Sequence, residues 1–400
     1  MARHRGRLVR RLDLKPLAFR LVDRLVGASP ARRHRAGFYP DPGWPAERVV
    51  LAHASRHRFA LTRPRYAEAL RAVSQANVDV FDPGSWFTDP DEALRLCAFL
   101  DDVVVPGHTL TPVDRRTGLR LYHGSGTRAR WGFAHPAPTA LRARPIDGPC
   151  LAIPPFRHYG HLLTDVLMPA FFALERGLVP PGETLHVVTA RAPDALVRGF
   201  IDGLAASGRA VRHVEIGPFE HVAASRYLHA QSCCPNLERL FSTPEAIGLA
   251  RESYRAAYRG RPRAAPARRL YVSRGGARLR RVEGEAELVA GLRRLGFEVF
   301  EPAWANHHDQ VELFAAADVV VGVHGAALAN MLWARPDALL IELMSANGRK
   351  STGLHWAAEA GADYRPLFGS PEGPKQSFSI DPAATLREIE AILAEREGRA

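Results

Sequence analysis

Residues 318–330 read DVVVGVHGAALAN: a β-branched run, a turn of small residues and an apolar stretch with helical spacing. This pattern predicts a buried strand over Asp318–Gly322 that leads into a helix over Ala326–Trp333. The same alternation extends outward on both sides. We expect strands over 269–273, 298–300 and 338–343, and helices over 283–295, 309–316 and 353–360. Strands that alternate with helices indicate βαβ units, so this part of the chain is predicted to be α/β with a parallel sheet.

The half of the chain before residue 262 shows a weaker form of this alternation. Short β-like runs occur at 49–52, 103–105 and 119–122, and the run Glu92–Leu100 has helical spacing. Beyond them we expect strands over 150–153, 185–189 and 211–216, a helix from Tyr159 or Gly160 to Arg176, and a helix over 193–203. A last helix is expected over Pro382–Arg396, able to pack on either half.

Four hundred residues with 46% hydrophobic content exceed one ordinary core, which favours two domains. The Arg- and Pro-rich segment 259–266 has the composition of a linker. The predicted units are a basic N-terminal leader over 1–45, an N-terminal acceptor-side α/β domain over 46–262, a C-terminal nucleotide-binding domain over 267–370 and a C-terminal helix over 381–400.

Positive charge dominates the chain: 54 Lys and Arg residues stand against 42 Asp and Glu residues, for a net charge of +12. Such a field favours phosphate-bearing partners, which include nucleic acid, anionic lipid and nucleotide sugars. The abundance of Arg and Ala also fits the coding bias of a GC-rich genome. Because no recognition-helix pattern, zinc knuckle or RNA-binding aromatic stripe is present, we expect no nucleic-acid partner.

Four cysteines, at positions 97, 150, 233 and 234, are too few for a disulfide framework and lack the spacing of a zinc or redox pair. They favour a reduced, cytoplasmic protein. No apolar run approaches the ~18 residues that cross a bilayer, and no cleavable signal follows the basic N-terminus. The stretch Leu8–Val26 fits a basic amphipathic helix on anionic lipid as well as a docked or solvated leader. Peripheral contact with the inner membrane therefore stays open, as does the oligomeric state.

The turn after the strand 318–322 suits a phosphate group. Helix N-termini offer N–H groups and partial positive charge beyond the carboxyl ends of parallel strands. Gly325, Ala326 and Ala327 would let a diphosphate approach the backbone, and His324 would donate to a phosphate oxygen. A tight strand–helix turn around a core histidine fits the same residues.

An arginine-rich loop, Arg274–Arg281, follows the strand 269–273. Guanidinium groups bind a diphosphate through paired hydrogen bonds and would replace a metal ion on the leaving group. Arg274 is the strongest candidate, although a solvated basic loop has the same composition. Glu342, at the end of the next strand, would accept from ribose hydroxyls or form a structural salt bridge.

In the N-terminal half, His161 and Asp165 lie four residues apart at the start of a predicted helix, so both lie on one face. An imidazole oriented by a carboxylate can act as a general base toward an acceptor hydroxyl. The same pair would also stabilise the first turn of the helix.

Two stretches suggest metal binding only superficially. His307-His308-Asp309 and His324 match no zinc spacing. Asp89-Pro90-Asp91 spells the DxD of metal-dependent transferases, but no apolar strand precedes it, and we expect a turn. No metal site is predicted.

Taken in order, the stretches above resemble glycosyltransferase family 61, whose members add sugars to protein or polysaccharide acceptors and whose bacterial relatives are linked to capsular polysaccharide synthesis. The resemblance covers about residues 150–345, and the ordered set is what makes it specific. The matching stretches are Tyr159-Gly160-His161 with Asp165, Tyr271–Arg274 with Arg278 and Arg281, Gly296-Phe297, Gln310 with Phe314 and Ala317, His324–Leu328 with Asn330, and Ile341-Glu342-Leu343. Where the family usually has Asn-Glu, this chain has Gly284-Glu285, which puts a polar contact of that Asn in doubt.

The resemblance implies a GT-B arrangement, in which two Rossmann-like domains face each other across a cleft. It also implies inversion at the anomeric carbon without metal or other cofactor, with a nucleotide-diphosphate sugar, expected to be UDP-linked, as donor. By this resemblance Glu342 takes the ribose, Asn330 buttresses the loop, and His161 or Asp165 is the base. The residues implied to hold the diphosphate are Arg274, Arg278, Arg281, His324, Gly325, Ala326 and Ala327.

The predicted function is therefore transfer of a sugar from this donor to a glycan hydroxyl. A second hypothesis is a non-catalytic nucleotide- or glycan-binding protein of a polysaccharide assembly system. A Rossmann oxidoreductase is disfavoured, because no GxGxxG follows a strand.

Overall fold

A computed structural model of the chain describes residues 36–37, 49–53, 93–115, 120–121, 142–156, 158–230, 244–261, 267–303, 307–348 and 352–398. Several sequence-based predictions fall elsewhere, namely most of the leader over 1–45, the Leu8–Val26 stretch, the Asp89-Pro90-Asp91 turn, Cys233 and Cys234. They lie outside the described residues and stay predictions. We call the part up to residue 261 the first lobe and the part from residue 267 the second lobe.

The first lobe is built on a mixed sheet with the strand order β1-β6-β5-β4-β10-β7-β8-β9, and β3 pairs with β2 and β10. The strands are β1 Ala36–Gly37, β2 Val49–His53, β3 Ala93–Leu100, β4 Val103–Pro106, β5 Val113–Asp114, β6 Arg120–Leu121, β7 Arg144–Ile153, β8 Leu185–Ala190, β9 Val211–Ile216 and β10 His221–Ala230. From β10 to β9 all neighbours are parallel. The chain runs from β7 through β8 to β9 and then places β10 on the other side of β7, so the strand order reverses between β7 and β10.

The second lobe has a parallel sheet with the order β13-β11-β14-β15-β16. Its strands are β11 Arg269–Val272, β13 Glu298–Phe300, β14 Val319–Val323, β15 Leu339–Met344 and β16 Asp363–Phe368, with a separate pair of β12 Val282–Glu283 and β17 Phe378–Ser379. The order reverses between β11 and β14. In open α/β sheets, ligands bind beyond the carboxyl ends of the strands at such a switch point.

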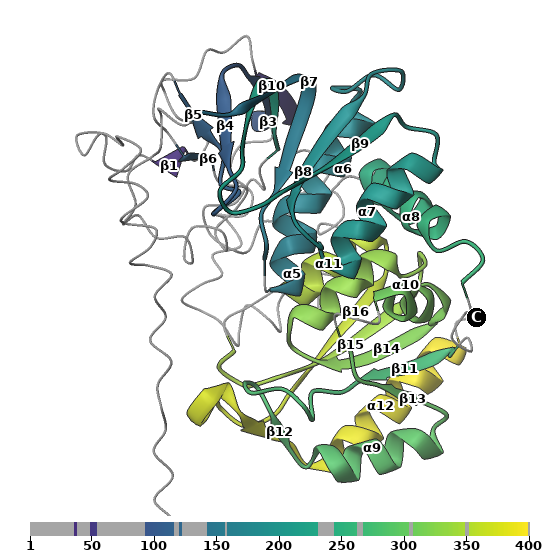
Figure 1. Cartoon of the computed structure of the whole chain (residues 1–400). Helices are drawn as coiled ribbons and strands as arrows, with labels where there is room; N and C mark the ends of the chain where they lie inside the picture. The colour runs from purple at the N-terminus through teal and green to yellow at the C-terminus, as the bar shows by residue number, and fades with distance from the viewer. Residues whose placement is uncertain are drawn as a thin grey trace, which may run out of the picture.

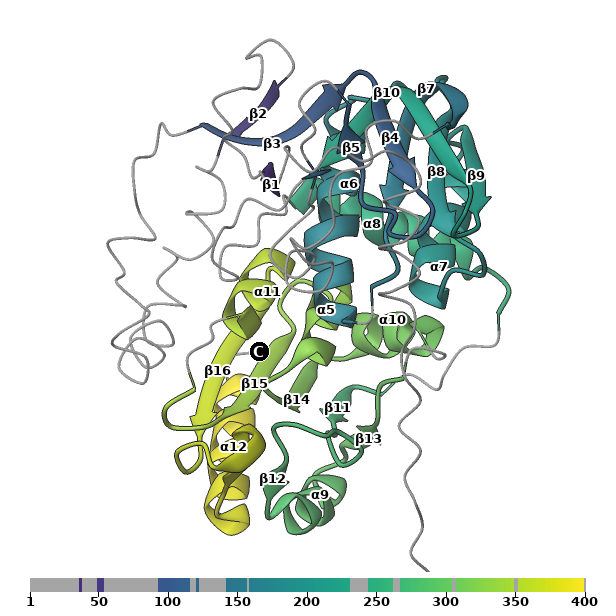
Figure 2. The same cartoon turned by 60° about the vertical axis from the view of Figure 1, so that its left-hand side comes forward.

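A layer of helices lies between the two sheets (Figures 1 and 2). The helices of the first lobe are α5 Tyr159–His161, the π-helical η3 Leu162–Leu167, α6 Met168–Glu175, α7 Ala195–Ala206 and α8 Pro244–Ala257. Those of the second lobe are α9 Glu285–Arg294, α10 His307–Ala316, the 3₁₀-helical η5 Ala326–Trp333, α11 Thr352–Ala360, η6 Pro374–Gln376 and α12 Pro382–Glu397.

One hydrophobic core joins the lobes. Its buried residues come from α6, α7 and α8 on one side and from α10, η5 and α11 on the other. The rings of Tyr254 on α8 and Trp333 on η5 lie 4.9 Å apart, and Arg251 Nε donates to the carbonyl of Leu332 at 2.8 Å. A second core, under α9 and α12, covers the other face of the second sheet. This sheet is thus covered by helices on both faces, as expected for a parallel α/β fold.

Most of the predicted elements are confirmed within one or two residues at each end, and one is wrong. The run Glu92–Leu100 has helical spacing, but the structure has the strand β3 over Ala93–Leu100. Leu94, Leu96, Ala98 and Leu100 also alternate with the period of two that a strand requires. Pairing with β2 and with β10 decides between the two periods. The sequence-based analysis also missed β10, α8 and β16 altogether.

The predicted helix from Tyr159 to Arg176 is one helical segment that changes type, from α5 through η3 to α6. It ends at Gly177, which has φ +75°, as expected for a helix stop. A π-helical turn is uncommon and occurs often at functional sites. Here it contains Thr164 and Asp165.

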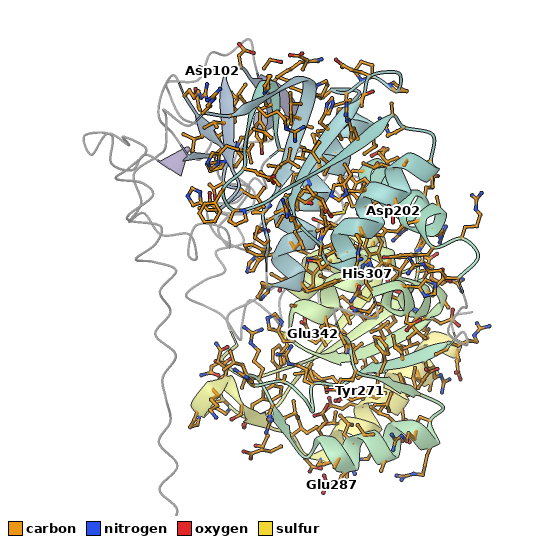
Figure 3. All side chains as sticks on the ribbon, viewed as in Figure 1. Asp102, Asp202, Tyr271, Glu287, His307 and Glu342 are labelled. Atoms are coloured by element: carbon orange, nitrogen blue, oxygen red, sulfur yellow. The ribbon has the colours of Figure 1, made fainter. Side chains whose placement is uncertain are left out.

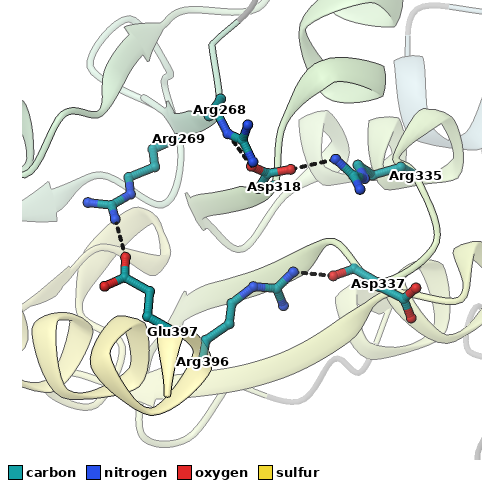
Figure 4. A network of polar contacts seen from close by, with 7 residues as sticks. All are labelled: Arg268, Arg269, Asp318, Arg335, Asp337, Arg396 and Glu397. Carbon is teal, nitrogen blue, oxygen red and sulfur yellow. Dashed lines mark hydrogen bonds and ion pairs between the residues drawn. The ribbon is translucent and has the colours of Figure 1, made fainter. Parts of the chain in front are cut away.

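Helix α12 packs on the second lobe, with Ile389 and Leu393 in its core. At the amino ends of the strands, arginines link it to the sheet (Figure 4). Arg269 donates to Glu397 at 2.7 Å, and Arg396 donates to the carbonyl of Asp337. These contacts lie at the end of the sheet opposite the switch point.

In the described ranges, no helix is long and apolar enough to span a membrane. Cys150 is buried and free, and burial raises the pKa of its thiol to about 12. A thiol in this environment is unreactive, which fits a structural role.

Candidate active site

The switch point of the second sheet is the place where Arg274 meets Gly325. Arg274 follows β11 and Gly325 follows β14, and these two strands are neighbours. A Cβ atom on Gly325 would lie 1.8 Å from Nη1 of Arg274, so the guanidinium fits against this turn only because the residue is glycine. The structure therefore brings together two of the residues predicted to bind the diphosphate.

Glu285 holds the backbone at the start of the arginine-rich loop. Its Oε1 accepts hydrogen bonds from the Tyr271 hydroxyl at 2.9 Å, the Ser273 hydroxyl at 3.0 Å and the Arg274 amide at 3.1 Å. The preceding residue, Gly284, has φ +93°. Glycine and asparagine are the residues that enter this left-handed region most readily. The exchange of the family's Asn for Gly284 therefore keeps the backbone geometry that Glu285 requires.

Arg274 and Arg280 form a partly buried pair of cations. Burial and the charge of Arg280 lower the pKa of Arg274, against the opposing effect of Glu285. Burial also lowers the pKa of Arg280, and the carboxylates of Glu372 and Glu342 oppose it. Nε of Arg274 is buried and has no hydrogen-bond partner. Burial disfavours the charged form of both guanidinium groups, and one of them has an unused donor. Such a pair is suited to an anionic ligand.

The other arginines of the loop lie differently from Arg280. The predicted ligands Arg278 and Arg281 are exposed, and Nε of Arg281 donates to the carbonyl of Ala277. Arg280, which the sequence did not single out, is half-buried with φ +59°. Its amide donates to the carbonyl of Lys375 at 3.0 Å. This contact with a distant turn decides which arginine points inward, and no local pattern reveals it.

His324 forms a carboxylate-backed imidazole after β14. Its Nδ1 lies 2.7 Å from Oε1 of Glu342, and the Tyr364 hydroxyl donates to Oε2 of Glu342 at 2.6 Å. Since Nδ1 is occupied by the carboxylate, Nε2 is the nitrogen left for a ligand. His324 itself is 8% exposed.

Glu342 does not lie where a ribose could reach it. Its side chain is 0% exposed, and both carboxylate oxygens have protein partners. Helix α11 closes over it, since a Cβ atom on Gly353 would lie 2.2 Å from Oε2. The expected ribose contact is therefore corrected: Glu342 acts on the site through His324. Figure 3 shows Glu342 inside the second lobe, close to its boundary with the first.

Asn330 is fully buried beneath the turn at 325–327. Its Nδ2 donates to the carbonyl of Ala327 at 2.9 Å and to Oε1 of Gln310 at 2.8 Å. Its Oδ1 accepts from the hydroxyl of Tyr159, in the first lobe, and from Nε1 of Trp333. The contact with Ala327 is the one that the predicted buttressing of the loop requires, and Tyr159 extends it across the two lobes.

In the first lobe, His161 and Asp165 form the pair that their spacing predicts. Nδ1 of His161 lies 2.9 Å from Oδ2 of Asp165. The Thr164 hydroxyl lies 3.0 Å from Oδ1 of Asp165 and 2.8 Å from the carbonyl of Gly160. The side chain of Asp165 is 4% exposed and that of His161 is 23% exposed. The carboxylate is therefore enclosed, and the imidazole is the group that a substrate can reach.

The part of the site in the first lobe contacts the part in the second lobe. Helix α5 follows β7, which ends at the switch point of the first sheet. A Cβ atom on Gly160 would lie 3.4 Å from both Cα and Cβ of Ala326. Gly160 immediately precedes His161, and Ala326 belongs to the predicted diphosphate turn. The candidate base and the candidate donor site thus come from different lobes and adjoin at this contact.

Beside His324 the second lobe has a pocket of about 200 Å³. It is lined by Arg280, His324, Met344, Ser345, Asn347, Gly348, Glu372, Gln376 and Phe378. Only His324 among these was selected from the sequence. Arg280 comes from the arginine-rich loop, Met344 ends β15 and Phe378 lies on β17. The rest come from the segments after β15 and around η6, which carry no recognisable motif.

The histidines of α10 do not join His324. Nδ1 of His307 lies 2.6 Å from the Tyr258 hydroxyl, and burial lowers the pKa of His307 to about 3. Figure 3 shows His307 where the two lobes meet. Nδ1 of His308 lies 3.3 Å from Asp309. Among the residues that the structure describes, no group of three or more His, Cys, Asp or Glu side chains could hold a metal ion.

The chain was compared with known protein families and with curated proteins. The family model described as Glycosyltransferase 61 matches residues 159–341. The matched segment begins at Tyr159, contains His161, Arg274 and His324, and ends at the residue before Glu342. A search of curated proteins found no match. Over residues 159–341 the chain is similar to glycosyltransferase family 61, and this segment includes His161 with Asp165 in the first lobe and Arg274 with His324 in the second.

Proposed function

We propose that this glycosyltransferase has a GT-B arrangement and moves a sugar, with inversion, from a nucleotide-diphosphate donor to a hydroxyl group of a glycan or polysaccharide. The observation that carries the proposal is the contact between Gly160 and Ala326. It puts a carboxylate-backed imidazole from one lobe next to an arginine-lined turn of the other. Inversion is a single displacement, which requires one base on the acceptor side and charge stabilisation on the leaving-group side. Each lobe offers one of the two.

On the acceptor side, His161 is the proposed base and Asp165 the residue that positions it. In the proposed tautomer Nδ1–H of His161 donates to Asp165, so Nε2 carries the free electron pair. Nε2 removes the proton of the acceptor hydroxyl as its oxygen attacks the anomeric carbon. The bond between that carbon and the diphosphate oxygen breaks in the same step, and the nucleotide diphosphate leaves with the electron pair.

On the donor side, Arg274, Arg280, His324 and the amides of the turn 325–327 are proposed to hold the diphosphate. Guanidinium groups stabilise the negative charge that develops on the leaving group, which is the basis for proposing a metal-independent reaction. His324 is proposed to contact the diphosphate through Nε2, while Glu342 holds the ring from behind at Nδ1. Arg278 and Arg281, exposed on the same loop, are proposed as outer contacts.

The remaining features of the proposal concern partners and place. We propose a UDP-linked donor, a cell-envelope glycan such as a capsular polysaccharide as acceptor, and a cytoplasmic location. Peripheral contact of the basic N-terminus with the inner membrane belongs to the same proposal. These follow from the family resemblance and from the net charge of +12.

Nucleotide sugar turnover tests the proposal directly. Purified protein is incubated with a panel of nucleotide sugars, and release of the nucleotide diphosphate is followed with and without a chelator. We expect release with at least one donor, unchanged by the chelator. Release that stops on chelation would contradict metal independence. Binding without any turnover, with or without acceptor glycans, would instead favour the non-catalytic binding protein.

A variant links this activity to the site. Arg274→Ala should weaken nucleotide-diphosphate binding in calorimetry by about ten- to a hundredfold, since it removes a charge-assisted contact. Arg293→Ala, at an exposed position on α9, is the matched control and should bind as the unmodified protein does. If all three proteins bound the nucleotide diphosphate with equal affinity, the diphosphate would not bind at Arg274.

A further inference from the structure

We infer that the pocket beside His324 receives the nucleoside half of the donor and that Glu372 binds its ribose hydroxyls. The inference rests on the proposed function, because it takes the diphosphate to lie at Arg280 and His324. Both of these residues also line the pocket. A nucleoside joined to a diphosphate at that position therefore reaches the pocket directly.

Glu372 is the acid that the pocket offers in place of the enclosed Glu342. Its amide donates to Oδ1 of Asn347 at 2.7 Å, and its Oε1 accepts from the Ser345 hydroxyl at 3.1 Å. These two contacts fix the carboxylate at the pocket wall. A carboxylate accepts about four hydrogen bonds, so the Ser345 contact leaves capacity for both hydroxyls of a ribose. Acidic residues bind ribose hydroxyls in the same way in other nucleotide-binding sheets.

The rest of the pocket suits a nucleobase. Met344 and Phe378 contribute apolar surface, and the amide side chains of Asn347 and Gln376 also line the pocket as hydrogen-bonding groups. Pockets for whole small molecules measure roughly 300–1,000 Å³. The 200 Å³ found here fits one part of a nucleotide sugar. The sugar to be transferred then stays outside, on the side of the diphosphate where the first lobe lies.

Backbone strain marks the same wall. Arg280, Lys375 and Gln376 have φ of 59°, 58° and 61°, which non-glycine residues rarely adopt. They hold one another: the Arg280 amide donates to the carbonyl of Lys375, and Nε of Arg280 lies 3.2 Å from Oε1 of Gln376. Strained residues cluster at ligand sites, where the surrounding structure keeps them in place. Here the strain fixes an arginine and an amide at the mouth of the pocket.

Calorimetry with ribose analogues tests the role of Glu372. The nucleoside diphosphate that binds best is compared with its 2′-deoxy and 3′-deoxy forms. We expect the unmodified protein to prefer the ribose form over at least one deoxy form by about tenfold or more, as for a charge-assisted hydrogen bond. Glu372→Ala should reduce this preference to less than about threefold, and Glu372→Gln, which keeps the size of the side chain, should give an intermediate value. Glu283→Gln, at an exposed position on β12, is the control and should keep the full preference.

The outcomes separate this inference from the proposed function. If the unmodified protein binds no nucleoside diphosphate, both are overturned. If it binds ribose and deoxy forms equally, or if Glu372→Ala keeps the full preference while melting at the normal temperature, Glu372 is not the ribose ligand and the proposed function stands. A loss of preference in Glu372→Ala with unchanged binding of inorganic pyrophosphate supports the inference, because the diphosphate contacts are then intact.

Discussion

Two histidines of this protein share the same support and differ in their surroundings. Nδ1 of His161 lies 2.9 Å from Asp165, and Nδ1 of His324 lies 2.7 Å from Glu342. Each carboxylate is buried, and each has a hydroxyl group at its other oxygen. We call these the acceptor-side pair and the donor-side pair. Side-chain chemistry alone does not distinguish them.

The residues around each pair distinguish the two pairs. His324 of the donor-side pair lines a pocket together with Arg280, whose pKa the carboxylate of Glu342 influences. The acceptor-side imidazole is surrounded by rings instead: His158 lies 4.3 Å and Phe156 lies 6.1 Å from its centroid. A cationic surrounding attracts an anionic ligand, whereas a surrounding of aromatic rings does not supply that charge. One structural device can therefore supply a base in one lobe and an anion ligand in the other.

Replacing His161 should give the largest effect, and it should fall on kcat rather than on donor binding. His161→Gln removes the base, so we expect kcat to fall by about a hundred- to ten-thousandfold. Its affinity for the nucleotide diphosphate should stay within about twofold, because the donor contacts remain. Steady-state kinetics and calorimetry measure the two quantities. His186→Gln, in the first lobe but on β8, is the control. A His161→Gln enzyme with full kcat would assign the base elsewhere.

Replacing the two carboxylates should also affect kcat and nucleotide-diphosphate binding separately, with smaller fold-changes. Asp165→Asn and Glu342→Gln keep the shape and remove the charge that supports each ring. We expect Asp165→Asn to lower kcat, and Glu342→Gln to weaken nucleotide-diphosphate binding, each by about ten- to a hundredfold. The comparison above would be wrong if both variants changed the same parameter.

The fold of the second lobe is easier to predict from the sequence than the fold of the first, because of where the pairing partners of each strand lie in the chain. In the second lobe each strand and its helix are neighbours in sequence, so local periodicity was enough for β11, β14 and β15. In the first lobe β3 pairs with β10, more than a hundred residues away, and its sequence fits two periods. Pairing between distant strands leaves no local signal, and this is why β3 was assigned wrongly.

The site was predictable to a similar extent. The pairing of His161 with Asp165 follows from their spacing, and the place of Arg274 and Gly325 follows from the ends of two strands. The enclosure of Glu342 depends on α11, which passes over it at Gly353. The inward position of Arg280 depends on Lys375. Both are contacts between segments far apart in sequence, so composition and spacing could not reveal them.

A third histidine shows what happens without a carboxylate. His307 has the Tyr258 hydroxyl at Nδ1, and burial lowers its pKa to about 3 from the ordinary value of 6.5. The folded protein thus holds this ring neutral where the unfolded chain would protonate it. Stability is fully present above pH 6.5 and falls as the pH drops toward 3. This group alone contributes a slope of up to about 1.4 kcal/mol per pH unit in that window.

His307→Phe should flatten that slope. Denaturant unfolding at several pH values between 7 and 5 would compare the two proteins. Carboxylates contribute to the slope in both, so the difference between them isolates His307. Identical slopes would mean that His307 is already accessible to protons in the folded state.

The smallest effects should come from the two hydroxyl groups, and they should be unequal. The Thr164 hydroxyl has one proton and two acceptors within reach, Asp165 and the carbonyl of Gly160. We expect Thr164→Val to lower kcat only about two- to threefold, since a single neutral hydrogen bond is lost and it was shared. Tyr364→Phe instead leaves Oε2 of Glu342 fully buried without its 2.6 Å donor. An unsatisfied buried charge costs more, so nucleotide-diphosphate affinity should fall about tenfold and the melting temperature should drop. If the fold-change in kcat of Thr164→Val equalled the fold-change in affinity of Tyr364→Phe, the two hydroxyl groups would be stabilising the fold and not the two carboxylates.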